Sequence, residues 1–436
     1  MIITVLKAVI EAEAGWAVGA ADSGLAGLDR ELLTDARGCP WVPPSSLGGS
    51  LRAHLTGLGA DERLMGSRPP APDRLRSAEP PELGPSALWL LGTRIYRAKG
   101  DDGDEDPAGR PATTVEANTA VDPRRRAALP RSLRHSRVVD EPTVIELYAQ
   151  FDGRLPDGDL KLLASWRPQI GRDRTRGGGS ARLSSIGYRF YDLSQDDDLR
   201  AWLEAPGPDR FGPLTDLRVT GESDDLLIDD EFEIAGALHV GTGSRRDKVS
   251  VTRMRDGQPL VPGSSWKGLF RARAGYIVRT CWGEDAACTC QTGCGKCLVC
   301  DIFGSAARRG RIAFRSSAIT TADSPQTLNH VAIDRVSGGA RDKLLFSDDV
   351  ITSGTLKLTI TALDVVEPWQ GDLLRHVERD IHDGLIGVGG GAQRGQGTLR
   401  LTAASQASLA NLQPMPDSPP PGAAHVAAKS AEEAAR

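Results

Sequence analysis

The sequence predicts an α+β protein built from two tandem copies of one fold. Its 436 residues exceed the length of one ordinary domain, so two domains are expected. A segment that opens a helix, residues 261–272 (VPGSSWKGLFRA), has a near copy at residues 42–53 (VPPSSLGGSLRA). In each copy proline and glycine form a turn, and the paired serines are expected to cap the helix that follows. Such a helix start presents backbone N–H groups and the positive end of a helix dipole, which suits a phosphate.

Strand-like and helix-like patterns follow one another in a similar order in both halves. In the first half we expect a strand, a glycine-rich segment, the serine helix, a short strand or turn, a strand and a helix, at residues 2–10, 15–27, 45–58, 87–94, 144–151 and 159–165. In the second half we expect a strand, a glycine turn, the second serine helix and a later strand, at residues 230–239, 241–244, 261–272 and 354–363. This mixture of strands and helices indicates the α+β class.

Four landmarks recur in the second half in the order in which they occur in the first. They are an aspartate (Asp29 and Asp247), a serine pair (Ser45, Ser46 and Ser264, Ser265), an Asn/Asp pair (Asn118, Asp122 and Asn329, Asp334) and an Arg-Gly loop (Arg176, Gly177 and Arg394, Gly395). Matching members lie 211 to 219 positions apart, so little is inserted between the landmarks. We therefore expect domains at residues 1–208 and 216–408, a linker at 205–215 and a disordered tail at 411–436.

Composition limits the possible functions. Aromatic residues make up 5% of the chain, which argues against broad base-stacking platforms, and the net charge of −5 argues against a basic nucleic-acid arm. Arginines nevertheless cluster at residues 124–126, 172–176 and 308–309, and such local patches can bind phosphates. No apolar run approaches the roughly 18–20 residues that span a bilayer, and the N-terminus has the pattern of a strand rather than of a signal peptide. We expect a cytoplasmic protein without a membrane partner.

Six of the seven cysteines lie between Cys281 and Cys300. In a reducing compartment such clustering favours a metal over disulfides. The spacing of Cys294, Cys297 and Cys300 suits one tetrahedral ion, which predicts structural zinc in an insertion at residues 281–300. The fourth ligand is open among Cys281, Cys288 and Cys290; we prefer Cys290. An iron–sulfur cluster is the alternative.

Taken together, the motifs resemble the RAMP superfamily of CRISPR–Cas systems, in particular the Cas-seven-like backbone subunits of type III effector complexes. The features that match are the aspartate ahead of the serine helix, the Phe-Gly-Ser at residues 303–305, the Val-x-Ile-Asp-Arg at 331–335 and the late Arg-Gly-x-Gly loop. The resemblance covers almost all of residues 1–405 and is closer in the second half. The first half departs from it at residues 91–93, where the family favours Phe-Gly, and has no cysteine cluster.

The resemblance implies a ferredoxin-like (RRM-like) core in each half, with a β-hairpin thumb around residues 118–150 and 329–363. It also implies crRNA, target RNA and other CRISPR effector subunits as partners. Glycine loops, serine helix starts and arginines hold phosphates whatever the base sequence, which suits a guide RNA of changing sequence. The residues expected to bind RNA are Ser45, Ser46, Arg52, Arg124, Arg176, Gly177, Ser264, Ser265, Lys267, Arg271, Arg335, Arg394 and Gly395.

The two repeated aspartates, Asp29 and Asp247, are the expected catalytic residues. In type III backbone subunits the resemblance implies an aspartate at this position for cleavage of target RNA, with Mg²⁺ or another divalent ion. Two alternatives stay open. One is a non-catalytic crRNA-binding scaffold in which both aspartates are structural, and the other is a guide-processing endoribonuclease that needs a catalytic histidine, for which His330 and His239 are candidates.

Overall fold

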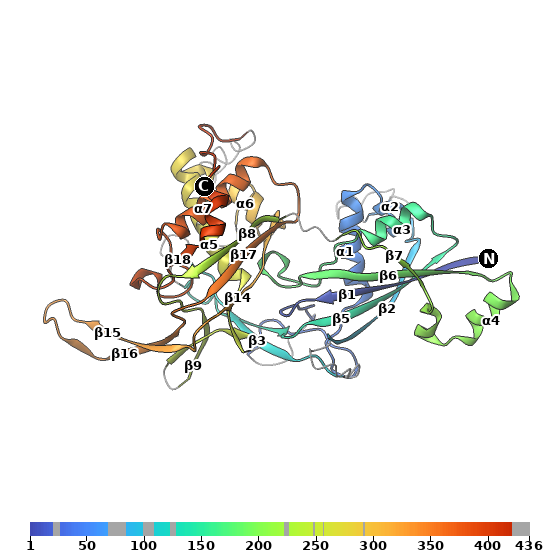
Figure 1. The fold of residues 1–436 in the computed structure, drawn as a ribbon, viewed down its shortest axis with the longest axis horizontal. Coiled ribbons are helices and arrows are strands. Elements are labelled where there is room, and N and C mark those ends of the chain that lie inside the picture. The colour runs from blue at the N-terminus through green and yellow to red at the C-terminus, as the bar shows by residue number, and fades with distance from the viewer. Residues whose placement is uncertain are drawn as a thin grey trace, which may run out of the picture.

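The computed structural model describes residues 1–20, 27–68, 84–98, 109–122, 128–221, 226–246, 249–255, 257–290 and 293–420 (Figure 1). Two of the predicted site residues, Arg124 and Asp247, lie outside the described residues, as does the part of the tail at 421–436. No helix within the described ranges is long and apolar enough to cross a membrane.

The first half of the chain forms an antiparallel sheet with the strand order β2-β5-β1-β6-β7. The strands are β1 (Ile2–Ala12), β2 (Leu88–Arg97), β5 (Thr143–Asp152), β6 (Ala181–Asp192) and β7 (Thr215–Leu217). The helices are α1 (Pro44–Gly57) and the short α2 (Asp61–Met65) between β1 and β2, α3 (Asp157–Ala164) between β5 and β6, and α4 (Asp196–Glu204) between β6 and β7. The strands and helices that the sequence predicts in this half are confirmed.

The larger hydrophobic core of this half lies between one face of the sheet and the helices α1, α2 and α3, and a smaller cluster of Ile3, Val5, Tyr148, Tyr191 and Phe211 lies beside α4. Alternate residues of β1, including Leu6, Ala8 and Ile10, point to one face of the sheet and are buried there. Leu51 and Leu55 pack against them from one side of α1. The buried face of β1, formed by alternate residues, therefore packs against the buried face of α1, formed by residues four positions apart.

The second half forms a larger sheet, in which the order of the connected strands is β11-β12-β14-β17-β8-β18 and β13 also pairs with β17. The strands are β8 (Leu226–Ile234), β11 (Met254–Arg255), β12 (Gln258–Val261), β13 (Ile312–Phe314), β14 (Ser317–Thr320), β17 (Thr355–Ala362) and β18 (Leu399–Leu401). The helices are α5 (Gly263–Trp282), α6 (Leu298–Phe303), α7 (Pro368–His382) and α8 (Ala403–Gln406). Trp266 and Phe270 of α5 and Leu373 and Val377 of α7 fill the core under this sheet.

The four central strands have the same order and the same connections in both halves. The chain runs β1-α1-β2-β5-α3-β6 in the first half and β8-α5-β14-β17-α7-β18 in the second. In each sheet the first strand lies between the third and the fourth, and the second strand lies outside the third. The repeated landmarks of the sequence thus lie on elements with the same connectivity.

Each half inserts a β-hairpin between its second and third central strands. These hairpins are β3 (Thr113–Asn118) with β4 (Arg134–Val139), and β15 (Gln326–Ile333) with β16 (Ala340–Val350). The second hairpin extends away from the rest of the molecule (Figure 1). The expected thumbs at 118–150 and 329–363 therefore need correction, because β5 and β17, which make up their second arms, are central strands of the sheets.

The second hairpin is continued by β10 (Val249–Thr252) and β9 (Gly241–Arg246), giving the sheet order β15-β16-β10-β9. The glycine turn expected at residues 241–244 is part of β9, so that prediction is corrected as well. Asp247 falls between these two strands, outside the described residues.

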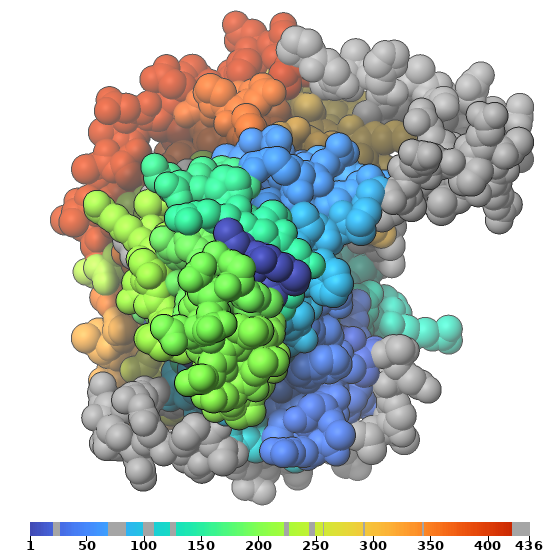
Figure 2. All heavy atoms as spheres, turned by 90° about the vertical axis from the view of Figure 1, so that its right-hand side faces the viewer, coloured from blue at the N-terminus to red at the C-terminus, as the bar shows by residue number. Residues whose placement is uncertain are grey.

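Two segments expected to be loose are packed. Residues 205–215 were predicted as a linker, but Phe211 is buried edge-on against Tyr148, with 4.9 Å between ring centroids. Figure 2 shows the end of the molecule at which β1 begins, where green segments of the first half lie around the dark blue start of β1. In the predicted tail, Met415 packs on the second core and Trp282 donates its Nε1–H to the carbonyl of Pro416 (2.9 Å).

Candidate nucleic-acid interface and metal centre

The start of α5 differs from the serine cap that the sequence suggests. Pro262 is the N-cap residue, with φ −69° and ψ 147°, and Ser264 and Ser265 lie within the first turn. Helix α1 begins in the same way after Pro43, and neither helix has a side-chain hydrogen bond at its cap. Proline takes this place because its ring fixes φ near the extended value and it has no N–H to satisfy. The prediction of serine caps is thus wrong, although the serines do lie at the helix starts.

The glycine loop of the first half lies directly against the start of α5. Within this loop, residues 174–176 form a single 3₁₀ turn, and Lys267 of α5 donates a hydrogen bond to Oγ1 of Thr175 over 2.6 Å. A Cβ atom on Gly263 would lie 2.8 Å from the carbonyl oxygen of Arg176, closer than real side chains come. A Cβ atom on Gly177, whose φ is 85°, would lie 3.0 Å from the carbonyl of Phe314. Glycine on both sides therefore permits this contact.

This contact, which we call the junction, joins a landmark of the first half to a different landmark of the second. The Arg-Gly loop at 171–180 contacts the Pro-Gly-Ser-Ser helix start at 262–265. From the sequence, each of these segments could only be matched with its own repeat in the other half, and their contact was not predicted. Thr175 and Asp173, which take part in the junction, are residues that the sequence analysis did not single out. Their position inside the arginine cluster at 172–176 was the one available signal.

Cations outnumber carboxylates at the junction. Asp173 contacts three arginines: it pairs with Arg176, and lies 3.8 Å from Arg172 and 4.0 Å from Arg30. Burial lowers the pKa of Arg172, and burial with the nearby Arg309 lowers that of Arg174. The guanidinium groups of Arg172 and Arg174 therefore lie where a positive charge is less stable than in water.

Lys267 is the most strongly perturbed cation of this group. Burial, followed by repulsion from Arg176 and Arg271, lowers its pKa to about 7, with Asp173 acting in the opposite direction. An anion placed beside Lys267 would raise this pKa and lower the free energy of the charged lysine. Lys267 therefore lies in a cluster where a positive charge is disfavoured unless an anion is close to it.

A second contact between the halves involves the first hairpin. Arg255 lies 3.1 Å from Glu116 of β3 and 3.2 Å from Asp140, and Arg253 donates to the carbonyl of Ala117 over 2.8 Å. Both arginines are largely buried. Together with the junction, these ion pairs hold the two sheets against each other at two places.

Four thiols meet where the segment that follows α5 reaches the first turn of α6. The sulfurs of Cys288, Cys294, Cys297 and Cys300 all lie within 4.8 Å of one another. The sulfurs of Cys288 and Cys294 lie 3.6 and 4.0 Å from that of Cys300. Zn–S bonds of about 2.3 Å in a tetrahedron place the sulfurs roughly 3.8 Å apart, so this group fits zinc.

The fourth thiol of this cluster is Cys288 and not Cys290, the residue preferred from the sequence. Cys290 and Cys281 are exposed, whereas Cys297 and Cys300 are buried. The backbone N–H groups of residues 294 and 297 point to sulfur atoms of Cys288 and Cys294 at 3.4 and 3.2 Å. The fold of the loop, which depends on left-handed glycines at 293 and 295, decides which thiol turns inward.

Arg271 belongs to the cysteine cluster rather than to an open RNA surface. Its guanidinium donates to the sulfur of Cys300 over 3.1 Å and to the carbonyl of Gly304 over 2.6 Å. The pKa of Cys300 is lowered to about 4, first by a hydrogen bond from Cys297, with Arg271 contributing. A zinc ion bound here would have four thiolate ligands and no open position, so its role would be structural.

Asp29 lies at the base of the first hairpin. Its Oδ2 accepts the backbone N–H of His135 in β4 at 2.7 Å, and its own N–H donates to the carbonyl of the same residue at 3.0 Å. The side chain is exposed. Arg30, the next residue, also bonds to β4 and reaches toward Asp173 of the junction. The carboxylate is therefore held in a fixed orientation close to the cation cluster.

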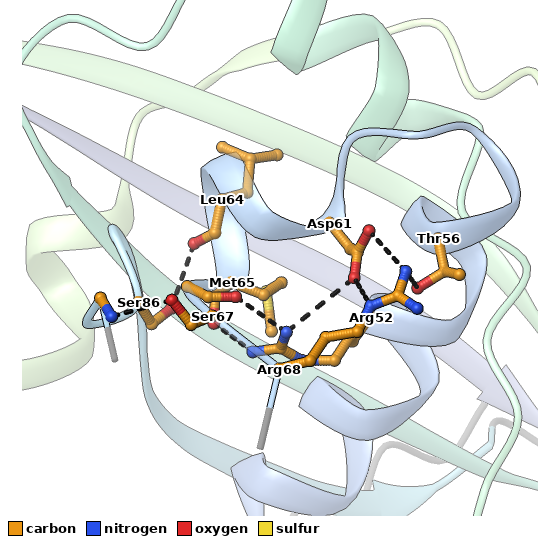
Figure 3. A network of polar contacts seen from close by, with 10 residues as sticks. Arg52, Thr56, Asp61, Leu64, Met65, Ser67, Arg68 and Ser86 are labelled. Carbon is orange, nitrogen blue, oxygen red and sulfur yellow. Dashed lines mark hydrogen bonds and ion pairs between the residues drawn. The ribbon is translucent and has the colours of Figure 1, made fainter. Parts of the chain in front are cut away.

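Arg52 stabilises the C-terminal end of α2. It donates to the carbonyls of Met65 and of Gly66, the latter at 2.9 Å, and lies 4.0 Å from Asp61 (Figure 3). Arg68 forms two hydrogen bonds to the same carboxylate, at 2.8 and 3.0 Å, and it is the main reason that the pKa of Asp61 falls to about 2. Arg52 thus has structural partners that the sequence did not reveal.

The remaining predicted residues lie in the second half, away from the junction. Arg394 donates to Oδ2 of Asp348 at 2.9 Å and lies over the ring of Phe346, while Gly395 follows it with φ 83°. Arg335 is exposed at the tip of the second hairpin. Asp334 beside it accepts two backbone N–H groups at 2.9 Å and so shapes the turn.

A comparison with models of known protein families matches part of the second half of the chain. The family model of the RAMP superfamily matches residues 231–400, which run from β8 to β18 and include α5, the cysteine cluster and the second hairpin. A search of curated proteins finds no match to the chain. The second half is therefore similar to the RAMP superfamily, in agreement with the resemblance of its motifs.

Proposed function

We propose that the chain is a two-domain backbone subunit of a type III CRISPR effector complex that holds crRNA and cleaves complementary target RNA. The RAMP match of residues 231–400 supports a CRISPR-associated, RNA-binding role. The shared strand order of the two sheets supports two ferredoxin-like domains in tandem. The hairpins inserted at corresponding places support a thumb in each domain.

The junction carries this proposal. It combines backbone N–H groups of a helix start, glycine turns and cations from both halves around Lys267, whose pKa of about 7 favours an anionic partner. These groups recognise phosphates and not bases, so base pairing is left to choose the target. An RNA backbone that crosses the junction would contact both halves of the chain.

Cleavage is assigned to Asp29 and Asp247, one in each half. A divalent ion such as Mg²⁺ would stabilise charge on the scissile phosphate, and Mg²⁺ is commonly held by one or two carboxylates together with substrate phosphates. The exposed carboxylate of Asp29 has one oxygen fixed by the N–H of His135, and it lies beside Arg30. In this proposal Asp29 holds the ion while Arg30 contacts the phosphate.

The test is cleavage by the assembled complex with Asp29→Ala, Asp29→Asn and Asp247→Ala. Each variant should lose one distinct product band while crRNA binding stays within about twofold, since neither aspartate is assigned to crRNA binding. Unchanged cleavage by both alanine variants would favour the non-catalytic scaffold, in which Asp29 serves only to accept the N–H of His135. Chelation of divalent ions should abolish both bands in the unaltered complex.

A guide-processing endoribonuclease is the second candidate, and one cluster favours it. Nε2 of His330 lies 3.4 Å from Asp348 and 3.3 Å from Nε2 of Gln396, and Arg394 contacts the same aspartate. An imidazole beside a carboxylate and an arginine suits acid–base chemistry at a phosphate. Cutting of precursor guide RNA that persists without divalent ions and disappears with His330→Ala would establish this activity.

A further inference from the structure

A cavity of about 500 Å³ lies at one end of the first sheet, next to the second half. The end of β1, the starts of β5 and β6 and the residue after β2 surround it, since Ala12 pairs with Thr143 on one side and with Ala181 on the other. Arg315 of the second half completes the lining. Its volume lies within the range of about 300–1,000 Å³ that is usual for small-ligand sites, which often occur where domains meet.

A buried donor without a partner lies in the wall of this cavity. Trp166 is 2% exposed, and its Nε1–H has no acceptor among the described residues. Trp166 also borders a smaller cavity, but all the residues there have apolar side chains. An indole N–H only donates, so a ligand in the larger cavity that places an acceptor against Trp166 would remove the cost of this unpaired group.

The charged residues of the lining specify an anion with additional polar groups. Arg167, Arg182 and Arg315 line the cavity with Glu11 and Glu13, giving an excess of one positive charge. Glu13 lies 3.6 Å from Arg315, and Glu11 pairs with Arg182 and accepts from Ser184. Guanidinium groups suit phosphate oxygens, and carboxylates suit hydroxyl or amino donors of a ligand.

The rest of the lining suits a flat group. Small residues, including Ala12, Ala14, Ala98, Ala181 and Gly221, line the same cavity as the tryptophan and take up little of its width. A nucleobase meets these conditions, because it is flat and carries ring nitrogen or carbonyl acceptors, while its ribose and phosphate supply donors and negative charge. We propose that this cavity binds one nucleoside monophosphate unit, with its base at Trp166 and its phosphate near Arg315.

The same chemistry can come from a free nucleotide or from one unpaired nucleotide of a bound RNA. The inference does not depend on cleavage at Asp29 or Asp247, so it can fail or hold separately from the proposed function. It can be measured on the full chain by calorimetric titration with AMP, GMP, CMP and UMP, with the nucleosides and with inorganic phosphate.

We expect at least one monophosphate to bind with a micromolar to submillimolar Kd, and its nucleoside and inorganic phosphate to bind at least tenfold more weakly. Trp166→Phe should weaken the binding about fivefold, because it removes the donor and keeps an aromatic ring, and Arg315→Gln about tenfold. The controls Trp89→Phe and Arg37→Gln change exposed residues outside the cavity and should leave the Kd unaltered. If Trp166→Phe does not fold, Arg315→Gln alone decides, since Arg315 is partly exposed.

Absence of binding at millimolar concentration, equal binding of inorganic phosphate, or an unchanged Kd in folded Trp166→Phe and Arg315→Gln would each overturn the proposal. A competition experiment identifies the source of the nucleotide. Displacement of the monophosphate by a short single-stranded RNA points to a nucleotide unit of RNA, and failure of that RNA to compete points to a free nucleotide.

Discussion

Lys267 at the start of α5 donates a hydrogen bond to Oγ1 of Thr175 in the glycine loop of the first half, 2.6 Å away. The two residues are 92 positions apart in the chain and belong to different halves of it, Thr175 to a 3₁₀ turn and Lys267 to helix α5. Their contact brings the helix start of one repeat against the glycine loop of the other. Burial and the nearby arginines Arg176 and Arg271 lower the pKa of Lys267 to about 7. The charge of the junction therefore changes near neutral pH.

We predict that Lys267→Met makes the protein more stable at pH 6 and reduces the pH dependence of its stability. The folded pKa of about 7 is below the ordinary lysine pKa of 10.5, so between these values the unfolded chain binds more protons. Stability of the unaltered protein should therefore rise with pH across this window, and the full cost of the charged lysine applies below pH 7. That cost is on the order of 2–4 kcal/mol.

Urea unfolding between pH 6 and pH 9 measures this effect. Lys161→Met, which changes an exposed lysine of α3, is the matched control and should follow the unaltered protein. A difference between Lys267→Met and the unaltered protein that is the same at both ends of the pH range would contradict the prediction.

Gly177→Ala should destabilise the protein more than Gly395→Ala. The two glycines occupy matching loops with nearly the same φ, 85° and 83°, so the backbone strain of an alanine is similar, about 1 kcal/mol. Only at Gly177 does the new Cβ meet the other half, 3.0 Å from the carbonyl of Phe314; at Gly395 nothing lies within 4 Å. We expect an additional loss of roughly 1–2 kcal/mol for Gly177→Ala, measured by thermal unfolding. Equal losses would mean that the junction contributes little to stability.

One zinc ion per chain is expected, and Cys288→Ser should lose it while Cys290→Ser keeps it. Cys288 lies in the cluster of four thiols, whereas Cys290 is exposed. Loss of the metal removes the link between residues 288–294 and the start of α6 and should cost several kcal/mol of folding free energy. Elemental analysis and thermal unfolding with and without a chelator measure both effects. Retention of zinc by Cys288→Ser together with its loss from Cys290→Ser would restore the choice made from the sequence.

Arg52→Met should lower stability by about 2 kcal/mol and leave RNA affinity within twofold. The change leaves the carbonyls of Met65 and Gly66 without their charged donor. Arg176→Gln, at the junction, is the comparison and should weaken RNA binding instead. Filter binding at fixed salt, together with thermal unfolding, separates the two effects. Weaker RNA binding by Arg52→Met at unchanged stability would show that the arginine contacts RNA.

Much of the fold could be read from local patterns. The strands at 2–12 and 143–152 and the helices at 44–57 and 157–164 have clear hydrophobic periods, and short spacing brought Cys294, Cys297 and Cys300 to one site. The predictions that were wrong concern segments whose structure depends on contacts with residues distant in the sequence. The second arms of the expected thumbs became central strands because β5 and β17 pair with β1 and β8. Phe211 and Met415 packed on cores that the composition of their segments did not indicate.

The sequence by itself determined the repeated landmarks, the classes of element and the clustering of the cysteines, because these follow from residue types and short spacings. The tertiary structure alone decided which landmarks touch, so that the loop at 171–180 of the first half meets α5 of the second. It also decided that Arg52 and Arg271 have protein partners and that Cys288 turns inward. These outcomes depend on the relative placement of segments far apart in the chain, where packing and burial set the partner of each charge.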